Sequence, residues 1–309
     1  MVGWGMAWAL TGAVWAQDYP AKIIRIVTSP PGGSNDFAAR LLVRGFAERP
    51  GWQFVIDNRA TIVAPEVVMR AAPDGYTLLV TGGTFITGPL IEKLPYEPLR
   101  DFAPISLTHR QTNVLVVHPS LPVKSVKELI ALAKARPGQL NYASSGTGSA
   151  SHLSGVSFKI MTGTNIVRIN FKGLGAAVTS LLSGEVQLMN ANPAAIAPYL
   201  QAGRVRPLAI TSAQPSPLHP GLTTMAASGL PGYEMDVITA VYAPAGTPAA
   251  IVNRLHQEIV RAINLADIKE KFTNVGIETL GTTPQELTAA MKAEIARTSR
   301  LVKEGAIRN

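Results

Sequence analysis

The stretch "TSPPGGSNDFAARLL", residues 28–42, places two prolines and two glycines between an apolar run and a helical pattern. A β-rich run at 23–27 comes directly before it, and the helical pattern continues to residue 49. The corner itself contains no Lys, Cys or His. A strand-to-helix corner that is rich in Gly and bare of reactive side chains offers its backbone amides to a ligand. The stretch therefore predicts an α/β unit whose corner is either an ordinary turn with a helix cap or an anion-binding site.

The alternation of strand and helix recurs along the chain. The first half has further β-rich runs at 54–58 and 76–82, and the second half has runs at 140–144, 166–171, 185–190 and 205–211, with helical stretches between them. This pattern predicts an α/β fold whose sheets are covered by helices. Another β-rich run at 237–244 is followed by three helical stretches. We therefore expect the chain to cross into a second half and to return.

The length of the chain fits this division. A chain of 309 residues exceeds the usual size of one domain, and 47% hydrophobic and 16% charged residues are enough to build two cores. We expect lobe 1 to comprise residues 17–118 plus 239–309, lobe 2 to comprise 119–238, and a cleft to lie between them.

The composition excludes several kinds of chemistry. The absence of cysteine rules out disulfides, thiolate nucleophiles and Cys-ligated metals. The five histidines show no HxxxH or HxH spacing, so we expect no metal site and no cofactor. The net charge of +8 comes from basic residues that are scattered singly, without the aromatic interleaving of a nucleic-acid face. It fits either the steering of small anions or simple solubility, and we expect no nucleic-acid partner.

The first sixteen residues read as an export signal. "MVGWGMAWALTGAVWA" is uncharged, apolar and too short to span a bilayer, with Val14 and Ala16 at the positions that precede a cleavage site. A signal normally begins with Lys or Arg, and this stretch has neither. The alternative is a buried N-terminal helix. We expect residues 1–16 to be a signal peptide and the mature protein to be periplasmic.

A second corner, "NYASSGTGSASHLSG" at 141–155, matches the first in kind. Both follow a β-rich run and open a helix, and ligands of open α/β sheets bind beyond the carboxyl ends of the strands. Amides at a helix N-terminus favour an anion, and hydroxyl groups add donors. The hydroxyl groups are those of Ser34, Ser144, Ser145, Thr147 and Ser149. One such corner is ordinary turn and cap chemistry, but two of them predict a shared site.

Other site types have weaker support. Ser151 replaces the third glycine of GxGxxG, and neither a GxxxxGK[ST] nor a GxSxG motif occurs. His152, three residues after Ser149, is either a general base or a capping and packing residue. Asp36 either supports the first turn of its helix or orients waters and ligand groups. Arg168 and Lys172 either contact a distal charge of the ligand or are solvated cations.

Several stretches carry a resemblance to a known family. They are "YPAKIIRIVTSPPGGSNDFAARLL", "APDGYTLLV", "LPYEPLRDFAPISL", "HPSLPVKSVKELIALAKARPGQLNYASSGTGS", "HLSG" and "APAGTP". In this order they resemble the substrate-binding receptors of tripartite tricarboxylate transporters, the Bug receptor family, from Tyr19 to the C-terminus. The resemblance implies a type II periplasmic-binding-protein fold with two open, mainly parallel sheets. It also implies a monomer that captures a small carboxylate and delivers it to membrane permease subunits.

The resemblance also implies a site without catalytic residues, in which 31–36 and 144–149 hold one ligand carboxylate. We expect the ligand to be bound by Ser29, Pro31, Gly32, Gly33, Ser34, Asn35, Asp36, Gly83, Thr84, Ser144, Ser145, Gly146, Thr147, Gly148, Ser149, His152, Arg168, Lys172 and Asn190. The chain departs from the family pattern at 61–64, 168, 190–191 and 238. Two other functions stay open: a sensor with the same fold, and an enzyme acting on a small acid through Ser149 or His152.

Overall fold

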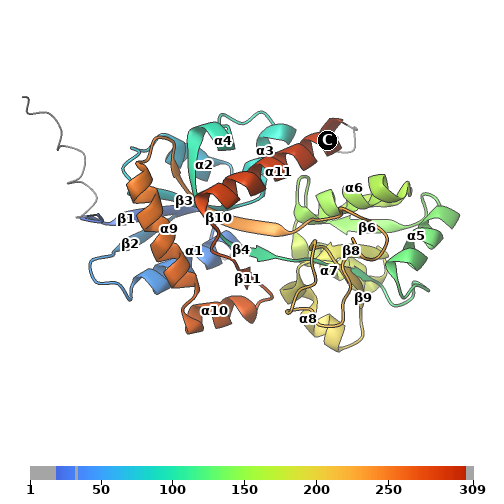
Figure 1. Ribbon diagram of the computed structural model, residues 1–309. Helices are drawn as coiled ribbons and strands as arrows, with labels where there is room; N and C mark the ends of the chain where they lie inside the picture. Colours follow the sequence, from blue (N-terminus) through green and yellow to red (C-terminus); the bar gives the residue numbers. More distant parts are fainter. Residues whose placement is uncertain (1–18, 32–33, 304–309) are drawn as a thin grey trace, which may run out of the picture.

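The computed structural model describes residues 19–31 and 34–303. The predicted signal peptide at 1–16 and two predicted ligand-binding residues, Gly32 and Gly33, lie outside the described residues. Within the described part of the chain, no helix has the length and apolar character needed to cross a membrane. Figure 1 shows two groups of helices and strands side by side, with β4 and β10 running between them.

The first sheet has the strand order β11-β4-β10-β3-β1-β2. Its strands are β1 (Ile24–Thr28), β2 (Phe54–Asn58), β3 (Thr77–Gly82), β4 (Phe102–Gln111), β10 (Val237–Pro244) and β11 (Glu278–Thr279). Strand β1 pairs in parallel with β2 and β3, as the βαβ pattern predicted. Strand β10 is antiparallel to both of its neighbours, and β11 is antiparallel to β4.

The second sheet has the order β7-β6-β8-β5-β9. Its strands are β5 (Val114–Val117), β6 (Asn141–Ser144), β7 (Val167–Asn170), β8 (Leu188–Ala191) and β9 (Arg206–Ile210). Here β6 is parallel to β7 and β8, while β5 is antiparallel to β8 and β9. Both sheets are therefore mixed, although the expectation was mainly parallel sheets. The difference arises because β5 and β10 are the strands on which the chain enters one sheet and returns to the other.

Helices cover both faces of each sheet. Those near the first sheet are α1 (Ser34–Phe46), α2 (Val63–Met69), α3 (Thr84–Ile91), α4 (Pro98–Asp101), α9 (Ala249–Ile263), α10 (Ala266–Thr273) and α11 (Pro284–Lys303). Those near the second are α5 (Val126–Ala135), α6 (Ala150–Thr162), α7 (Leu174–Ser183) and α8 (Pro193–Gln201). The two-sheet α/β fold predicted from the alternation is confirmed.

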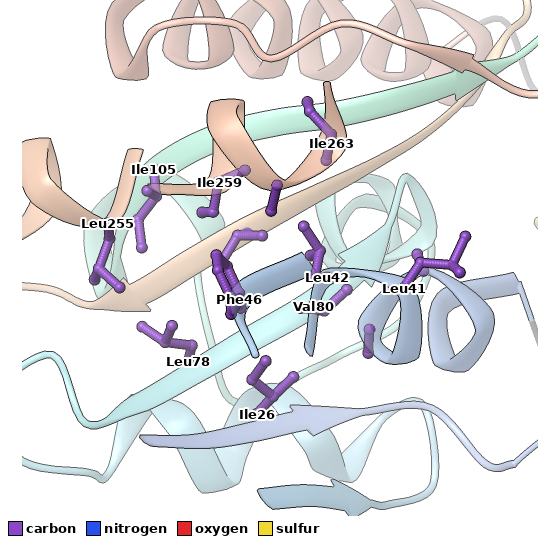
Figure 2. Close-up of a cluster of buried hydrophobic side chains, with 14 of the residues drawn as sticks. Ile26, Leu41, Leu42, Phe46, Leu78, Val80, Ile105, Leu255, Ile259 and Ile263 are labelled. Atoms are coloured by element: carbon purple, nitrogen blue, oxygen red, sulfur yellow. The ribbon is translucent and has the colours of Figure 1, made fainter. Parts of the chain in front are cut away.

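Alternating side chains of β1 and β3 divide the first core into two layers. Ile26 and Leu78 face α1 and α9, where they are buried with Phe46 and Leu255 (Figure 2). The intervening Val27 and Leu79 are buried on the opposite face, in a cluster that α3 and α11 also join. This period of two is what a strand buried on both faces requires. Because β1 and β3 are parallel, they lead into α1 and α3 at the same edge of the sheet.

The chain passes between the sheets twice. It leaves β4 at Gln111 and enters β5 at Val114, so β5 belongs to the second sheet although we placed it in lobe 1. The return lies between Ile210 of β9 and Val237 of β10. The lobe limits themselves remain predictions, and β5 favours moving the first limit before residue 114.

Helix α11 contacts the cores of both sheets. Leu287 and Met291 are buried with side chains of the first sheet, whereas Leu301 is buried in the cluster of the second sheet. In Figure 1 this helix runs from above β10 toward α6. The last helix therefore bridges the two halves, instead of covering the first half alone.

Candidate functional site

A cleft between the two halves contains two connected cavities. The first, which we call the polar arm, has a volume of about 170 Å³. Its lining comprises Ser34, Asn35, Gly82, Gly83, Thr84, Thr87, Gly148, Ala150, Leu153, Met235, Asp236, Val237, Glu294 and Arg297. These residues come from α1, the β3–α3 junction, the second corner, the return to β10, and α11. The two corners predicted to share a ligand therefore open on one cavity.

The second cavity, the apolar arm, also has a volume of about 170 Å³. It is lined by Thr61, Ile62, Thr84, Phe85, Thr87, Gly88, Ile91, Glu92, Leu94, Tyr96, Thr147 and Gly148. Thr84, Thr87 and Gly148 line both arms, so the arms meet at the N-terminal turn of α3 and the tip of the second corner.

The first corner is held in place from β2. The side-chain amide of Asn58 donates to the carbonyl oxygen of Ser29 at 2.6 Å and to Oδ1 of Asp36 at 2.8 Å. Asp36 is buried and also accepts a hydrogen bond from Nε of Arg40 at 2.9 Å. Asp36 lines neither arm, because its carboxylate faces Asn58 and Arg40. Asp36 therefore supports the first turn of α1 and also connects this helix to β2 through a hydrogen bond.

A glycine at the end of β3 makes room for the corner. A Cβ on Gly82 would lie 3.2 Å from Oδ1 of Asn35 and 3.2 Å from the carbonyl oxygen of Ile238. Thr239 of β10 donates to the same Oδ1 of Asn35 at 3.4 Å. Asn35 is therefore packed between β3 and β10, and its position at the start of α1 is set by both strands.

The second corner is built by its own serines. The hydroxyl of Ser149 donates to the carbonyl oxygen of Gly146 at 2.7 Å and caps α6 by accepting from the backbone amide of His152 at 3.3 Å. The amide of Ser145 donates to Oγ of Ser151 at 3.1 Å. None of these three serines lines either arm. Their hydrogen bonds shape the loop that presents Gly148.

His152 also supports this loop. Its Nδ1 accepts a hydrogen bond from the backbone amide of Gly148 at 3.0 Å. Burial, and secondarily the charge of Arg168, lowers the pKa of His152 to about 4. The imidazole is therefore neutral at neutral pH, with Nδ1 as the acceptor.

Arg168 of β7 contacts the second corner through hydrogen bonds. Its Nε donates to Oγ of Ser144 at 2.8 Å, and its Nη2 donates to Oγ1 of Thr147 at 3.1 Å and to Oδ1 of Asn170 at 2.8 Å. Burial lowers the pKa of Arg168. This guanidinium connects β7 to the corner and lines neither arm.

The predicted residues thus separate into two groups. Those that line the cleft are Ser34, Asn35, Gly83, Thr84, Thr147 and Gly148. Those that line neither arm are Ser29, Pro31, Asp36, Ser144, Ser145, Gly146, Ser149, His152, Arg168, Lys172 and Asn190. Lys172 is exposed, and Asn190 is buried in β8 with an Oδ1 that has no partner among the described residues.

The sequence reasoning missed an ionisable group in the polar arm. The side chain of Asp236 is 4% exposed, and burial raises its pKa to about 6. Nε of Arg110 lies 4.0 Å from Oδ2 of Asp236, and Thr211 donates to Oδ1 at 3.3 Å. Glu294, whose pKa burial also raises, forms an ion pair with Arg297. No motif marks these residues, since the return loop and α11 bring them to the cleft from distant parts of the sequence.

Several known proteins are similar to this chain in sequence and architecture. A family model described as "Tripartite tricarboxylate transporter family receptor" matches residues 38–307. Protein BugT of Bordetella pertussis is 35% identical over 302 residues, which cover 96% of this chain and 93% of BugT. These matches agree with the resemblance carried by the two corners and their surroundings.

Two relatives have been solved with a carboxylate ligand. A protein of R. palustris, solved with adipate, is 37% identical, has a TM-score of 0.78, and is matched over 93% of this chain and 98% of its own. MatC from Rhodopseudomonas palustris, with bound malate, is 28% identical with a TM-score of 0.74, over 92% of this chain and 100% of its own. The chain belongs to the tripartite tricarboxylate transporter receptor family.

Proposed function

We propose that this protein is a periplasmic receptor that captures a small carboxylate in the cleft and delivers it to the permease of a tripartite tricarboxylate transporter. One observation carries the proposal: Ser34 and Asn35 of the first corner line the same cavity as Gly148 of the second. Relatives described with adipate and with malate support the ligand class.

The start of α1 suits a carboxylate. Ser34 and Asn35 occupy the first positions of a helix of 13 residues, where backbone amides lack intrahelical acceptors and the helix dipole favours an anion. A charge-assisted hydrogen bond contributes about 1.5 to 3 kcal/mol. Micromolar affinity needs about 8 kcal/mol, which four or five such bonds supply after ordering costs.

Binding from two sides suits a receptor that closes on its ligand. The segments that join the sheets are short at 111–114 and longer at 210–237. A carboxylate held by both corners would favour a closed arrangement over an open one, because only the closed form makes both sets of contacts. The permease would then distinguish the closed, ligand-bound receptor from the open, empty one.

We further propose that the ligand leaves the protein chemically unchanged. Oγ of Ser149 donates to the carbonyl oxygen of Gly146, and Nδ1 of His152 accepts from the amide of Gly148. A serine nucleophile would need its hydroxyl proton directed at a base, and here hydroxyl and imidazole face different partners.

Isothermal titration calorimetry against a panel of organic acids tests this function. Adipate, malate and aliphatic monocarboxylates serve as ligands, and chloride and sulfate serve as anion controls. We expect at least one carboxylate to bind at micromolar affinity with one site per chain, and to be recovered unchanged by NMR after prolonged incubation. If no carboxylate binds, or if the recovered acid is altered, the proposed function is wrong.

A further inference from the structure

The apolar arm separates into a floor and a rim. Phe85 and Tyr96 are buried, stack with ring centroids 5.3 Å apart and planes at 16°, and both line the cavity, so they form an aromatic floor. Ile62, Ile91 and Leu94 complete the lining around them. The cavity is continuous with the polar arm through Thr84, Thr87 and Gly148.

Ile62 is unusual on this surface. It is 57% exposed, the largest exposed fraction among the large hydrophobic side chains described. It lies between β2 and α2, at the cleft rather than at a distant surface. An apolar group of a ligand that covered Ile62 would gain the free energy of removing this surface from water.

The apolar arm crosses from one half of the protein to the other. A Cβ on Gly148 would lie 3.6 Å from Cδ1 of Ile91, so Ile91 of α3 reaches the tip of the second corner. A ligand held at the junction of the arms can therefore touch both the corner and the apolar lining.

The charges that line the apolar arm do not provide for a second carboxylate. Among the described residues that line the apolar arm, the one charged side chain is that of Glu92, which is exposed and would repel an anion. Arg297, the one cation lining the polar arm in the described chain, forms an ion pair with Glu294 through Nη2, and its buried Nε, which has no partner among the described residues, serves the polar arm and not the apolar arm. A second carboxylate buried in the apolar arm would lose its hydration without gaining a cationic partner.

We propose that the ligand is a monocarboxylate with an apolar body, aliphatic or aromatic. Its carboxylate lies where Ser34, Asn35 and Gly148 meet, and its apolar body fills the cavity lined by Ile62, Ile91 and Tyr96. This inference rests on the proposed function and narrows its ligand class. It predicts that chain length, and not a second charge, determines affinity.

A matched pair of ligands tests the inference on the unmodified protein. Hexanoate and adipate have the same number of carbons and differ by one terminal carboxylate. We expect hexanoate to bind at least about tenfold more tightly than adipate, because the second carboxylate must be desolvated without a partner. From butyrate to hexanoate, each added methylene should strengthen binding about fourfold.

A substitution at the rim provides an independent test. Ile62→Lys places an ammonium group in the apolar arm, so adipate should gain about threefold while hexanoate loses affinity. Val55→Lys is the matched control, because Val55 is 50% exposed on β2 and lines neither arm. The control should leave the affinities for both acids unchanged.

The outcomes separate this inference from the function on which it rests. Tighter binding of adipate than of hexanoate would overturn the inference alone and leave a carboxylate receptor. Equal affinities from butyrate to hexanoate would also overturn the inference alone. If neither acid nor any other carboxylate binds, both proposals fail. If Ile62→Lys does not fold, the comparison of hexanoate with adipate still decides.

Discussion

The backbone amide of Gly148 donates a hydrogen bond to Nδ1 of His152, with 3.0 Å between the two nitrogens. Gly148 has a φ of +75°, a conformation that favours glycine, and it lines both arms of the cleft. The bond therefore connects a buried imidazole on α6 to the loop tip that faces the ligand. Because His152 itself lines neither arm, we infer that it is a positioning residue that acts through Gly148.

Protonation of His152 should weaken the fold in acid. Burial lowers its pKa from 6.5 to about 4, so the unfolded chain binds this proton more readily than the folded chain. The stabilising effect of the neutral imidazole is complete above about pH 6.5 and is lost as the pH falls toward about 4. In urea unfolding experiments, His152→Gln should flatten this part of the pH profile and cost about 1 kcal/mol at neutral pH.

The control for this experiment is His118→Gln. His118 follows β5 and lines neither arm, and its Nδ1 interacts with the hydroxyl of Ser120. This variant removes an imidazole outside the cleft, so the difference between the two variants isolates the effect of His152 on the pH profile. If His152→Gln leaves the profile between about pH 4 and 6.5 unchanged, the buried, neutral state that we assign to His152 is wrong.

The backbone at Gly148 should matter for binding beyond its effect on stability. Gly148→Ala adds a Cβ at a position that lines both arms, and at φ +75° the new side chain strains the loop. Gly203→Ala is the matched control, with φ +66° and nothing within 4 Å of the new Cβ. Both variants should lose about 1 kcal/mol of unfolding free energy. By calorimetry, we expect about a tenfold loss of carboxylate affinity in Gly148→Ala alone; equal affinities in the two variants would contradict the assigned site.

Asp36 should behave as a structural residue. Asp36→Ala removes a buried carboxylate and leaves the partly buried amide of Asn58 without one of its acceptors, so thermal or urea unfolding should show a loss of about 2 kcal/mol. Asp267→Ala removes a more exposed carboxylate, paired with Arg44, and should cost less than about 1 kcal/mol. An unchanged melting temperature together with lost ligand affinity would show instead that Asp36 contacts the ligand.

Asp236 should make both stability and binding depend on pH. Burial raises its pKa from 3.8 to about 6, so its stabilising contribution is complete below about pH 3.8 and is lost as the pH rises through about 6. An ionised Asp236 also repels a carboxylate in the polar arm, so affinity should increase as the pH falls through about 6. Asp236→Asn should abolish this part of the pH dependence in calorimetric titrations. Persistence of the same dependence in the variant would exclude Asp236 as its source.

Local sequence patterns predicted the fold well for physical reasons. The runs at 23–27 and 76–82 became β1 and β3 because buried strands need continuous apolar residues, and the Gly-rich corners became helix starts. The directions of β5 and β10 could not be predicted, since strand pairing depends on where the chain crosses between sheets. Helix α3, which contributes Phe85 to the floor of the apolar arm, was also not predicted. Its sequence, TFITGPLI, contains a glycine and a proline that lower helix propensity.

The site was only partly predictable. Gly148, Ser34 and Asn35 lie at corners that the sequence marks with glycines and cap residues. Ser149 and Ser145 carried the same signal, but their hydroxyl and amide groups satisfy the loop itself, a distinction that depends on three-dimensional contacts. The apolar residues of the apolar arm and the acidic residues of the polar arm come together through tertiary packing alone.

The most direct test of the central claim is a crystal structure of the protein grown with hexanoate. We predict that the ligand carboxylate lies within hydrogen-bonding distance of the backbone at residues 34–35 and at residue 148, with its alkyl chain against Ile62 and Ile91. A carboxylate bound outside the two arms, or one that contacts a single corner with the other turned away, would contradict the account.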